Sequence, residues 1–467
     1  MTGILAFQVS QEVEDYAYLA AAVLFIYGLK EMASPRRARV GNLVSGAGML
    51  IAIVFTLLTL EIVDWTWIIA GLAIGSVIGA VLAYAVKMTA MPQMVAMLNG
   101  FGGLASGLVA LVEIYRRWGA PGDATEFLVT DGVSTLIGWV TFTGSMVAFA
   151  KLQEVVVSGR PVVFRFQKLA NFGLLVLAVL LIAALACWPG QPHWIIPLAL
   201  VSAAVGVLFV IPIGGADMPV VISLLNSYSG LAAAATGFLL KNNGLIISGA
   251  LVGASGIILT RLMCQAMNRS LFNVLFAAVG QVRAGEQKQR PPVKRYSAED
   301  AAVVMEGSRQ VVIVPGYGMA VAQAQHVIKE LADLLAQRGV EVKYAIHPVA
   351  GRMPGHMNVL LAEANVPYDQ LYTMEQINPE FEQADVALVI GANDVINPAA
   401  RTDKGSPIYG MPILDVDKAA TLMIIKRSLA TGFAGVDNDL FYSDKTMMLF
   451  GDAKAMVTDI VTAMKAG

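Results

Sequence analysis

The sequence predicts a multi-span α-helical membrane bundle of about nine helices, followed by an α/β domain with a doubly wound parallel sheet. The first observation is composition: 57% of the 467 residues are hydrophobic and only 14% are charged, whereas soluble proteins carry about 25% charge. The second is the length of the apolar runs in residues 1–280. The third is the change after residue 308, where short β-branched runs alternate with helical patterns.

A helix that crosses the hydrocarbon core of a membrane needs roughly 20 apolar residues. Runs of this kind occur at 16–33, 42–60, 66–86, 93–115, 127–150, 171–188, 194–213, 218–240 and 244–264. We therefore expect residues 1–280 to form a transmembrane domain. The N-terminus has no basic segment and carries Glu12 and Glu14 before its first apolar run, so we do not expect a cleavable signal peptide.

The distribution of Lys and Arg predicts the orientation of the spans. One set of loops is basic and contains Lys30, Arg36, Arg37, Arg39, Lys87, Lys151, Arg160, Arg165 and Lys168. The opposite loops contain only Arg116, Arg117 and Lys241. Because basic loops stay in the cytoplasm, an odd number of spans places the N-terminus outside and the C-terminal domain in the cytoplasm.

A polar, charged segment, residues 281–308, predicts a linker, and residues 309–467 have the size of one domain. In this domain we expect strands at 311–314, 342–346, 386–390, 412–414, 421–425 and 447–450, and a helix over 320–337. Strands that alternate with helices over short connections indicate a parallel sheet.

Residues 311–321, VVIVPGYGMAV, have the pattern of a strand that turns through glycines into a helix, which is typical of a Rossmann-like nucleotide site. Gly316 would permit the tight turn, and Gly318 would let the backbone approach a pyrophosphate. Val321 replaces the third glycine of the motif. This weakens the motif but still allows the helix and strand to pack closely.

The residues around this motif favour NADP over NAD. The second predicted strand, EVKYAIHP, ends without the acidic residue that would bind the ribose 2′-hydroxyl of NAD. Arg352 and the adjacent pair Lys426–Arg427, at the end of another predicted strand, supply cations that suit a 2′-phosphate. The alternative for the Lys-Arg pair is an ordinary solvated turn.

The segment GANDVINP, residues 391–398, also follows a predicted strand, so it should lie at the carboxyl edge of the sheet where ligands bind. Asn393 could contact a ligand there, or it could cap the next helix. Asp394 beside a phosphate or a nicotinamide would have a protonation state that depends on the ligand.

Polar side chains inside predicted spans are candidates for function, because burying them in lipid costs a few kcal/mol. Asn99, Asp217 and Asn226 are such candidates, whereas Ser223 and Ser227 are expected to hydrogen-bond between helices. The sequence has no histidine in any predicted span. A proton route would therefore depend on water held by amides and on a carboxylate at its mouth.

Other classes of function are disfavoured by charge and cysteine content. The net charge of −2 argues against a nucleic-acid partner. The two cysteines, Cys187 and Cys264, lie in apolar runs, so we expect neither a disulfide framework nor a metal site. A dehydrogenase that passes electrons to quinone would need a flavin or an iron–sulfur centre, and two such cysteines cannot ligate a cluster.

Five segments occur in order along the chain: GGADMPVVISLLNSYSG, GYGMAVAQAQ, AGRMPGHMN, GANDVINP and KRSLATGFAGVDN. Together they resemble the β subunit of the proton-translocating NAD(P) transhydrogenases, over nearly the whole chain. The resemblance implies a Si–Re specific enzyme of the bacterial inner membrane that couples hydride transfer from NADH to NADP⁺ to inward proton translocation. It also implies an α subunit that binds NAD(H), in an α2β2 assembly, since this chain has only one dinucleotide motif.

The resemblance further implies a set of NADP(H) contacts: Gly316, Tyr317, Gly318, Val321, Arg352, Met353, Pro354, Gly355, His356, Met357, Gly391, Ala392, Asn393, Asp394, Val395, Gly410, Met411, Lys426, Arg427, Ser428, Leu429, Ala430, Thr431, Gly432, Phe433, Asp452 and Ala453. In this set Lys426, Arg427 and Ser428 would hold the 2′-phosphate, and the loop through Phe433 would cover the cofactor. Asp394 would link the cofactor to the membrane, where Asn99, Asp217 and Asn226 are the candidates for the proton route.

One departure from the family affects the proton route. Some members have a histidine where this chain has Asn99, so the proton carrier must lie elsewhere, for example on the partner subunit. The alternative function is a transporter or other membrane protein regulated by an NADP-sensing domain. Solute flux through such a protein would persist without any NAD-binding partner.

Overall fold

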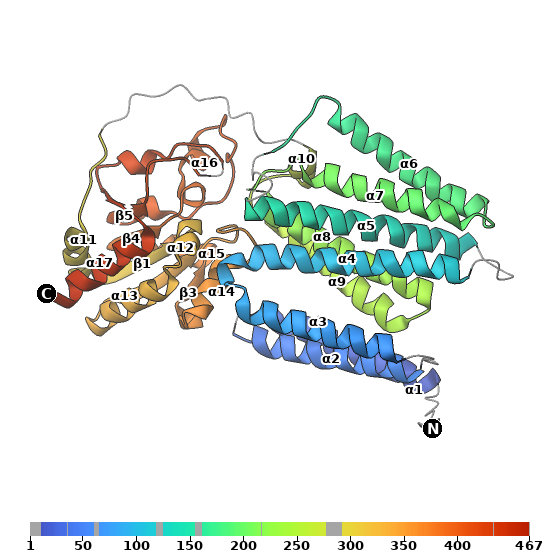
Figure 1. Cartoon of the computed structure of the whole chain (residues 1–467). Coiled ribbons are helices and arrows are strands. Elements are labelled where there is room, and N and C mark those ends of the chain that lie inside the picture. The colour runs from blue at the N-terminus through green and yellow to red at the C-terminus, as the bar shows by residue number, and fades with distance from the viewer. Residues whose placement is uncertain are drawn as a thin grey trace.

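The computed structural model describes residues 11–34, 36–59, 65–117, 125–154, 161–215, 217–276, 292–432 and 434–466. It has two parts, a bundle of long helices and an α/β unit that packs against one end of the bundle (Figure 1). Residues 281–291 of the expected linker lie outside the described residues.

Each predicted apolar run forms a long helix: α1 (Gln11–Met32), α2 (Ala38–Thr59), α3 (Thr66–Ala85), α4 (Met91–Arg116), α5 (Thr125–Gln153), α6 (Gln167–Cys187), α7 (Ile195–Val210), α8 (Met218–Leu240) and α9 (Asn243–Ala266). Among the described helices, eight are long and apolar enough to cross a membrane. The exception is α1, which carries Glu12, Glu14 and Lys30 near its ends. The chain is thus a membrane protein with eight candidate spans and a ninth, more polar helix.

Close helix contacts explain the small residues of the bundle. A Cβ atom on Gly138 of α5 would lie 2.7 Å from the carbonyl oxygen of Gly103 on α4, so the two backbones touch. Ser227 of α8 donates a hydrogen bond of 2.7 Å to the carbonyl oxygen of Gly253 on α9, and Ser223 donates one of 3.2 Å to that of Gly256. These bonds confirm the expected helix–helix role of the two serines.

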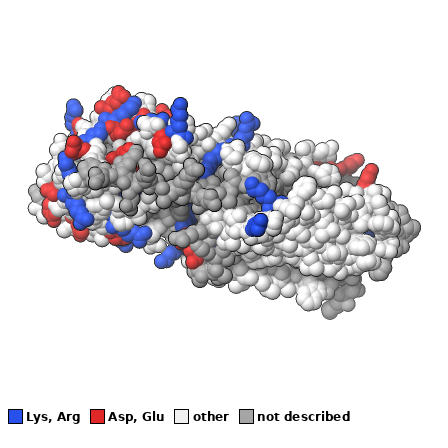
Figure 2. Space-filling model, turned by 90° about the horizontal axis from the view of Figure 1, so that it is seen from above, with Lys and Arg blue, Asp and Glu red and all other residues white. Residues whose placement is uncertain are grey.

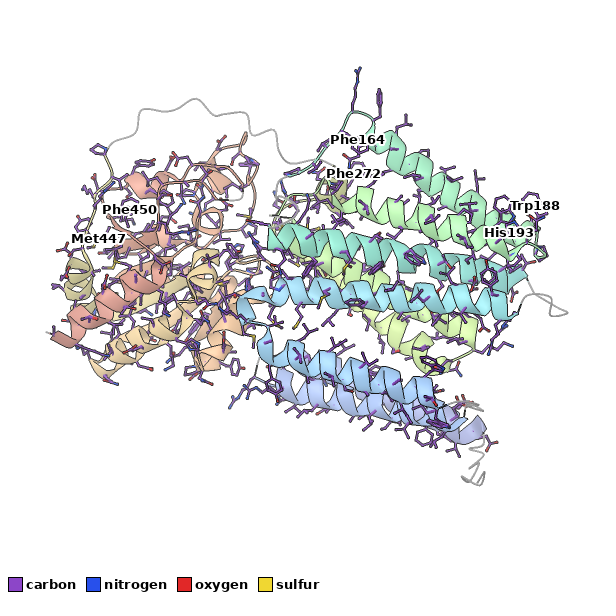
Figure 3. The ribbon with its side chains drawn as sticks, in the orientation of Figure 1. Phe164, Trp188, His193, Phe272, Met447 and Phe450 are labelled. Atoms are coloured by element: carbon purple, nitrogen blue, oxygen red, sulfur yellow. The ribbon has the colours of Figure 1, made fainter. Side chains whose placement is uncertain are left out.

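Charge distinguishes the two parts of the molecule. Figure 2 shows Lys, Arg, Asp and Glu spread over the α/β unit, whereas most of the visible bundle surface is uncharged. Trp188 and His193 lie at the end of the bundle far from the sheet, and Phe164 and Phe272 lie near the opposite end (Figure 3). The apolar surface between these ends is typical of a lipid-facing surface.

The α/β unit is built on a parallel sheet of six strands in the order β3-β2-β1-β4-β5-β6. The strands are β1 (Gln310–Pro315), β2 (Glu341–Ile346), β3 (Leu371–Thr373), β4 (Val386–Ile390), β5 (Thr421–Lys426) and β6 (Thr446–Phe450). All residues of β1 and β4 are buried, as expected for central strands covered on both faces. The structure confirms the predicted doubly wound sheet.

The α/β unit differs from the prediction at three places. Residues 412–414 form a loop, because Pro412 has no N–H to donate and Leu414 donates instead to the carbonyl oxygen of Val395. The strand that was missed is β3, whose three residues form too short a run to be noticed in the sequence. The predicted helix over 320–337 is divided into α12 (Tyr317–Ala322) and α13 (Gln325–Gln337), because Gln323 adopts a left-handed conformation with φ of 52°.

Further helices cover the sheet: α11 (Ala298–Glu306), α14 (His356–Glu363), α15 (Met374–Ile377) and α17 (Ala453–Ala466). Helix α16 (Ala399–Thr402) packs in a separate small cluster, and α10 (Leu271–Phe276) follows the bundle. One face of the sheet shares a core with α11, α13, α14 and α17. Helix α11 lies in the range expected for the linker, yet Ala301 and Met305 are fully buried against this core. The packed unit therefore begins before residue 309.

Candidate dinucleotide site

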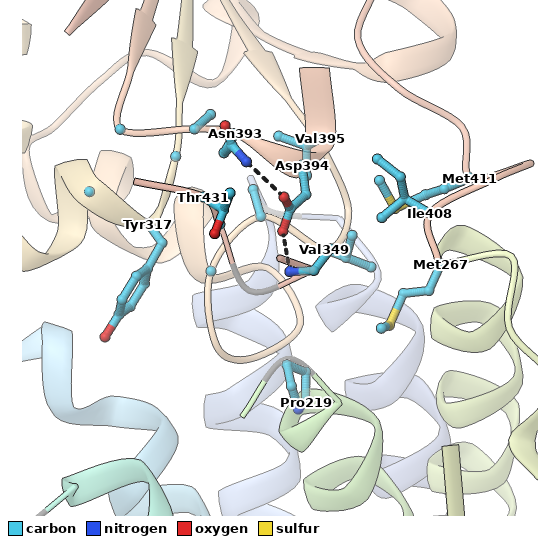
Figure 4. Close-up of a pocket in the computed structure, with 18 of the residues that line it drawn as sticks. Pro219, Met267, Tyr317, Val349, Asn393, Asp394, Val395, Ile408, Met411 and Thr431 are labelled. Carbon is cyan, nitrogen blue, oxygen red and sulfur yellow. Dashed lines mark hydrogen bonds between the residues drawn. The ribbon is translucent and has the colours of Figure 1, made fainter. Parts of the chain in front are cut away.

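A cleft opens at the carboxyl ends of β1 and β4, where the strand order reverses (Figure 4). Its main cavity has a volume of about 390 Å³. A second cavity of about 220 Å³ continues it over the end of β5 and shares Gly318, Asn393 and Gly432 with the first. Switch points of doubly wound sheets bind dinucleotides, and pockets of roughly 300–1,000 Å³ hold small ligands.

Most of the predicted contact residues line the cleft. They follow β1, β4, β5 and β6 in the chain: Gly316, Tyr317, Gly318, Val321, Gly391, Ala392, Asn393, Asp394, Val395, Met411, Lys426, Arg427, Ser428, Ala430, Thr431, Gly432, Asp452 and Ala453. The fold thus gathers segments that are more than a hundred residues apart in the sequence. Their contact with a cofactor stays a prediction.

The glycines of the cleft hold the loops after β1 and β4 against each other. A Cβ atom on Gly316 would lie 2.5 Å from the backbone of Ala392, and one on Gly318 would lie 2.6 Å from Cα of Gly391. Gly391 has a φ of 65°, which favours glycine, and its carbonyl oxygen accepts a 2.9 Å hydrogen bond from the N–H of Gly318. The sequence suggested that Gly318 makes room for a ligand, but here it makes room for the neighbouring loop.

Asn393 and Asp394 form a hydrogen-bonded chain in the cleft. The amide nitrogen of Asn393 donates to Asp394 at 2.9 Å, and the other oxygen of Asp394 accepts from the backbone N–H of Ala434 at 3.0 Å (Figure 4). The side chain of Asn393 makes no capping bond to the helical turn that follows it. Asp394 is therefore tied to the loop after β5, which forms one wall of the cleft.

Lys426, at the end of β5, joins the hydrogen-bonded group of Asn393 and Asp394. Its ammonium group donates to the side-chain oxygen of Asn393 at 3.3 Å and to the carbonyl oxygen of Ala430 at 2.9 Å. Burial lowers the pKa of Lys426, while the charge of Asp394 acts in the opposite direction. Arg427, the next residue, is exposed at the mouth of the second cavity. A cation poised at this position suits an anionic ligand group.

The remaining predicted contact residues line neither cavity: Arg352, Met353, Pro354, Gly355, His356, Met357, Gly410 and Leu429. Phe433 lies outside the described residues. Pro354 and Gly355 line a different cavity, of about 970 Å³, beside α9. Gly410 faces the end of α9 instead, where a Cβ atom would lie 2.2 Å from the side-chain nitrogen of Asn268.

Arg352 binds the membrane bundle in this structure. Its guanidinium donates to the carboxylate of Glu154 at 2.7 Å and to the carbonyl oxygen of Leu152 at 3.1 Å, both at the end of α5. It also stacks over the ring of Tyr317, with 4.5 Å from the guanidinium carbon to the ring centroid. The arginine thus joins the cleft wall to the bundle.

Two buried histidines hold the loops after β2 in place. Burial lowers the pKa of His347 to about 4, and its ring bonds the carbonyl oxygen of Pro412 at 2.8 Å. Burial, with the charge of Arg352, also lowers the pKa of His356 to about 4. The ring of His356 accepts a 3.1 Å hydrogen bond from the N–H of Arg352. Both side chains are therefore neutral at pH 7.

Sequence reasoning missed several residues that line the main cavity. Val349, Ala350 and Gly351 follow β2, so their place after a predicted strand could have identified them. Pro219, Met267 and Arg269 line the cavity from the membrane bundle. No sequence pattern predicts these three, because the contact depends on how the two parts of the molecule dock.

The bundle places a buried ion pair at this wall of the cleft. Asp217, at the start of α8, is 2% exposed, and both of its oxygens accept hydrogen bonds from Arg269 at 2.6 and 2.8 Å. Arg269 follows α9 and lines the cavity that also contains Asp394. The pair therefore joins the bundle to the cleft.

The two membrane amides lie deeper in the bundle. Asn99 of α4 is 8% exposed and donates a hydrogen bond of 3.3 Å to the carbonyl oxygen of Ile222 on α8. Asn226 lies one turn further along α8 and is half-buried. The structure thus brings the two segments together, with Asn99 bonding α8 one turn from Asn226. Their role in proton transfer stays a prediction.

Comparison with known proteins agrees with this geometry. Residues 14–463 match the family model described as NAD(P) transhydrogenase beta subunit. The NAD(P) transhydrogenase subunit beta of Rhodospirillum rubrum is 53% identical over 457 residues, which cover 96% of this chain and 98% of that protein. The NAD(P) transhydrogenase subunit beta from one particular strain of Rhodospirillum rubrum has the same identity and coverage. The chain therefore belongs to the family of NAD(P) transhydrogenase beta subunits.

Proposed function

We propose that the cleft binds NADP(H), and that the chain, together with an α subunit, transfers hydride from NADH to NADP⁺ while a proton moves inward across the membrane. The observation that carries the proposal is a single cleft with Lys426 and Arg427 at one end and Asp394 and Arg269 at the other. The first pair suits a 2′-phosphate. The second pair adjoins the membrane bundle.

The residues present fit such a cofactor. The cavities extend across the carboxyl ends of β1, β4 and β5, as a dinucleotide at a switch point requires. Lys426, Arg427 and Ser428 would hold the 2′-phosphate, and the close-packed loops at Gly318 and Gly391 would support the dinucleotide. When bound, the nicotinamide supplies the hydride chemistry. The protein residues orient it and exclude water.

Coupling between the cofactor and the proton requires that both bias one conformational equilibrium. The carboxylate of Asp394 accepts one hydrogen bond from Ala434, in the wall of the cleft, and another from Asn393. The ammonium of Lys426 donates a hydrogen bond to the same Asn393 side chain. Binding or release of an anionic ligand group at Lys426 would therefore alter the hydrogen bonds of Asp394 and of the loop after β5. On the membrane side, Arg269 binds Asp217 and lines the same cavity. Loss of charge on Asp217 would release Arg269 toward the cleft.

The membrane potential would supply the direction of the reaction. Hydride transfer between two nicotinamides is close to thermoneutral, whereas one proton that crosses the membrane contributes about 2.3 kcal/mol per 100 mV. Since about 1.4 kcal/mol changes an equilibrium constant tenfold, this drive is enough to shift the product ratio. The basic loops favour an α/β unit that faces the cytoplasm. Membership of the family favours a place in the bacterial inner membrane and an α2β2 assembly.

The test is to purify the chain with its α subunit, reconstitute both in liposomes, and measure hydride transfer and internal pH together. We expect hydride transfer only when both subunits are present, accompanied by a proton gradient. We expect Asp394→Asn to uncouple proton movement from NADP(H) exchange. Hydride transfer without a gradient in the unaltered complex would refute the coupling. Solute flux by this chain without the α subunit would instead favour a transporter with an NADP-sensing domain.

A further inference from the structure

A separate cavity of about 970 Å³ lies where the α/β unit meets the bundle, and we call it the junction cavity. None of the residues that line it also lines the cleft. Its walls come from the end of α9, from the loop between α1 and α2, and from the segments after β2 and around β3. Figure 1 shows β3 and α14 on the side of the α/β unit that faces the bundle.

The wall that α9 contributes belongs to the apolar surface of the bundle. Leu259, Leu262, Met263 and Ala266 line the junction cavity, and their spacing places them on one face of the last two turns of α9. Leu259 is 38% exposed and Leu262 is 55% exposed. Exposed leucines on a helix that crosses a membrane contact the acyl chains of lipids. The junction cavity therefore adjoins the lipid-facing surface at the end of a span, where phospholipid headgroups lie.

The loop between α1 and α2 supplies a cation at this level. Arg36 lines the junction cavity, is exposed, and makes no ion pair with another described residue. Its neighbour Arg37 pairs with Glu31 at 3.5 Å and does not line the cavity. A guanidinium binds phosphate through paired N–H donors, and basic side chains at the membrane surface bind lipid headgroups. Arg36 is thus placed to bind the phosphate of a headgroup.

The α/β unit supplies two carboxylates to the same cavity. Asp369, just before β3, and Glu375 of α15 both line it, and both are exposed. Neither makes an ion pair with another residue that the structure describes. Carboxylates repel phosphate and attract an ammonium group. From the membrane outward, the lining thus presents leucines, then a cation, then carboxylates.

A phospholipid with an ethanolamine headgroup has matching groups in the same order, namely acyl chains, a phosphate and a primary ammonium. We propose that the junction cavity binds phosphatidylethanolamine, with its phosphate on Arg36 and its ammonium on Asp369 and Glu375. Phosphatidylglycerol has no cation for the carboxylates, and the ammonium of phosphatidylcholine has no N–H to donate to them. The volume is sufficient, since pockets of roughly 300–1,000 Å³ hold ligands larger than this headgroup.

The bound headgroup supports one wall of the cleft. Pro348 and Pro354 line the junction cavity, whereas Val349 and Gly351, between them in the chain, line the cleft. Segment 348–355 therefore separates the two cavities. A headgroup that restricts this segment favours binding in the cleft, because a wall that is already ordered loses less freedom when a ligand binds. This effect rests on the proposed NADP(H) site, whereas the binding of lipid does not.

The test is native mass spectrometry of the complete αβ complex, released from nanodiscs with equal amounts of phosphatidylethanolamine, phosphatidylglycerol and phosphatidylcholine. We expect phosphatidylethanolamine to be retained at least fivefold more often than either other lipid. Arg36→Gln, and the double variant Asp369→Asn/Glu375→Gln, should each reduce its retention at least threefold. Arg37→Gln is the matched control, because it removes the same charge from the same loop outside the cavity, and it should match the unaltered complex.

Equal retention of the three lipids would overturn the proposal, as would equal retention of phosphatidylethanolamine by Arg36→Gln and Arg37→Gln. Retention by the β chain alone but not by the αβ complex would also overturn it, since the α subunit would then cover the cavity.

A second measurement tests the effect on the cleft. The unaltered complex should bind NADPH at least threefold more tightly in nanodiscs of phosphatidylcholine with phosphatidylethanolamine than in phosphatidylcholine alone, and Arg36→Gln should show no difference. Equal NADPH affinity of the unaltered complex in the two lipids would overturn the support of the cleft wall. Absence of NADPH binding in both lipids would count against the proposed function instead.

Discussion

Replacing Gly318 with alanine tests how the cleft is built. The new Cβ atom would lie 2.6 Å from Cα of Gly391, and the φ of Gly318 is not in the left-handed region, so the effect is steric alone. Carbon atoms in contact prefer about 3.5–4.0 Å, so the loops after β1 and β4 must separate by about 1 Å. The loop after β4 resists this, because Gly391 bonds Gly318 at 2.9 Å and Ile425 at 3.0 Å.

The magnitude follows from these contacts. Overpacking between two backbone segments costs about 1–3 kcal/mol, and a strained backbone hydrogen bond adds about 0.5–1.5 kcal/mol. Because the two loops form the floor of the cleft, we expect part of this cost to reduce affinity. A loss of about 1.4 kcal/mol weakens NADPH binding tenfold. We therefore expect Gly318→Ala to bind NADPH at least tenfold more weakly and to unfold at a lower temperature.

The assay is calorimetric titration of NADPH into the full chain in lipid nanodiscs, with thermal unfolding of the same samples. Gly307→Ala is the matched control, since its Cβ atom would lie 3.7 Å from the nearest atom, an ordinary contact, and its backbone φ of −79° suits alanine. Equal NADPH affinity and equal unfolding temperature in the two variants would show that the loops are not packed as described.

Three further predictions concern the network around the cleft. Glu154→Gln should remove the ion pair of Arg352 and leave its bond to Leu152, so NADPH affinity should change by only twofold to fivefold, as expected for a half-exposed ion pair worth about 0.5–1 kcal/mol. Titration calorimetry would measure this change, and a hundredfold change would contradict it. Asn393→Leu should weaken NADPH binding about tenfold, because the variant loses the hydrogen bond that positions the ammonium of Lys426 in the cleft. Unchanged affinity would show that this hydrogen bond does not contribute to binding. The folded-state pKa of His347 is about 4 and lies below its ordinary value of 6.5, so the stability due to its neutral ring is present above pH 6.5 and is lost as pH falls toward 4. His347→Gln should reduce the fall of the unfolding temperature across this range, leaving the part due to His356, and an unchanged slope would contradict the assignment.

The sequence predicted what depends on local patterns. The apolar runs gave the helices of the bundle, and the glycine segments after the β1 and β4 runs placed the cleft at the right edge of the sheet. It did not predict β3, whose three residues carry little signal. It also failed at Gln323, where only the local conformation shows that the helix is broken.

Contacts between distant segments could not be predicted in the same way. Arg352 was expected beside a cofactor, but the structure places its guanidinium against Glu154 and Leu152 of α5. Arg269 was not expected at the cleft at all, because its position depends on how the bundle meets the sheet.

The preference for a 2′-phosphorylated coenzyme can be measured directly. NADPH and NADH are titrated separately into the full chain in nanodiscs, with Lys426→Ala/Arg427→Ala as the comparison. Lys426 and Arg427 would each make a charge-assisted bond worth about 1.5–3 kcal/mol, so together they would contribute about 3 kcal/mol or more. NADPH should therefore bind at least a hundredfold more tightly than NADH, and the double variant should lose most of this difference. Equal affinity for the two nucleotides in the unaltered chain would contradict an NADP(H) site in this cleft.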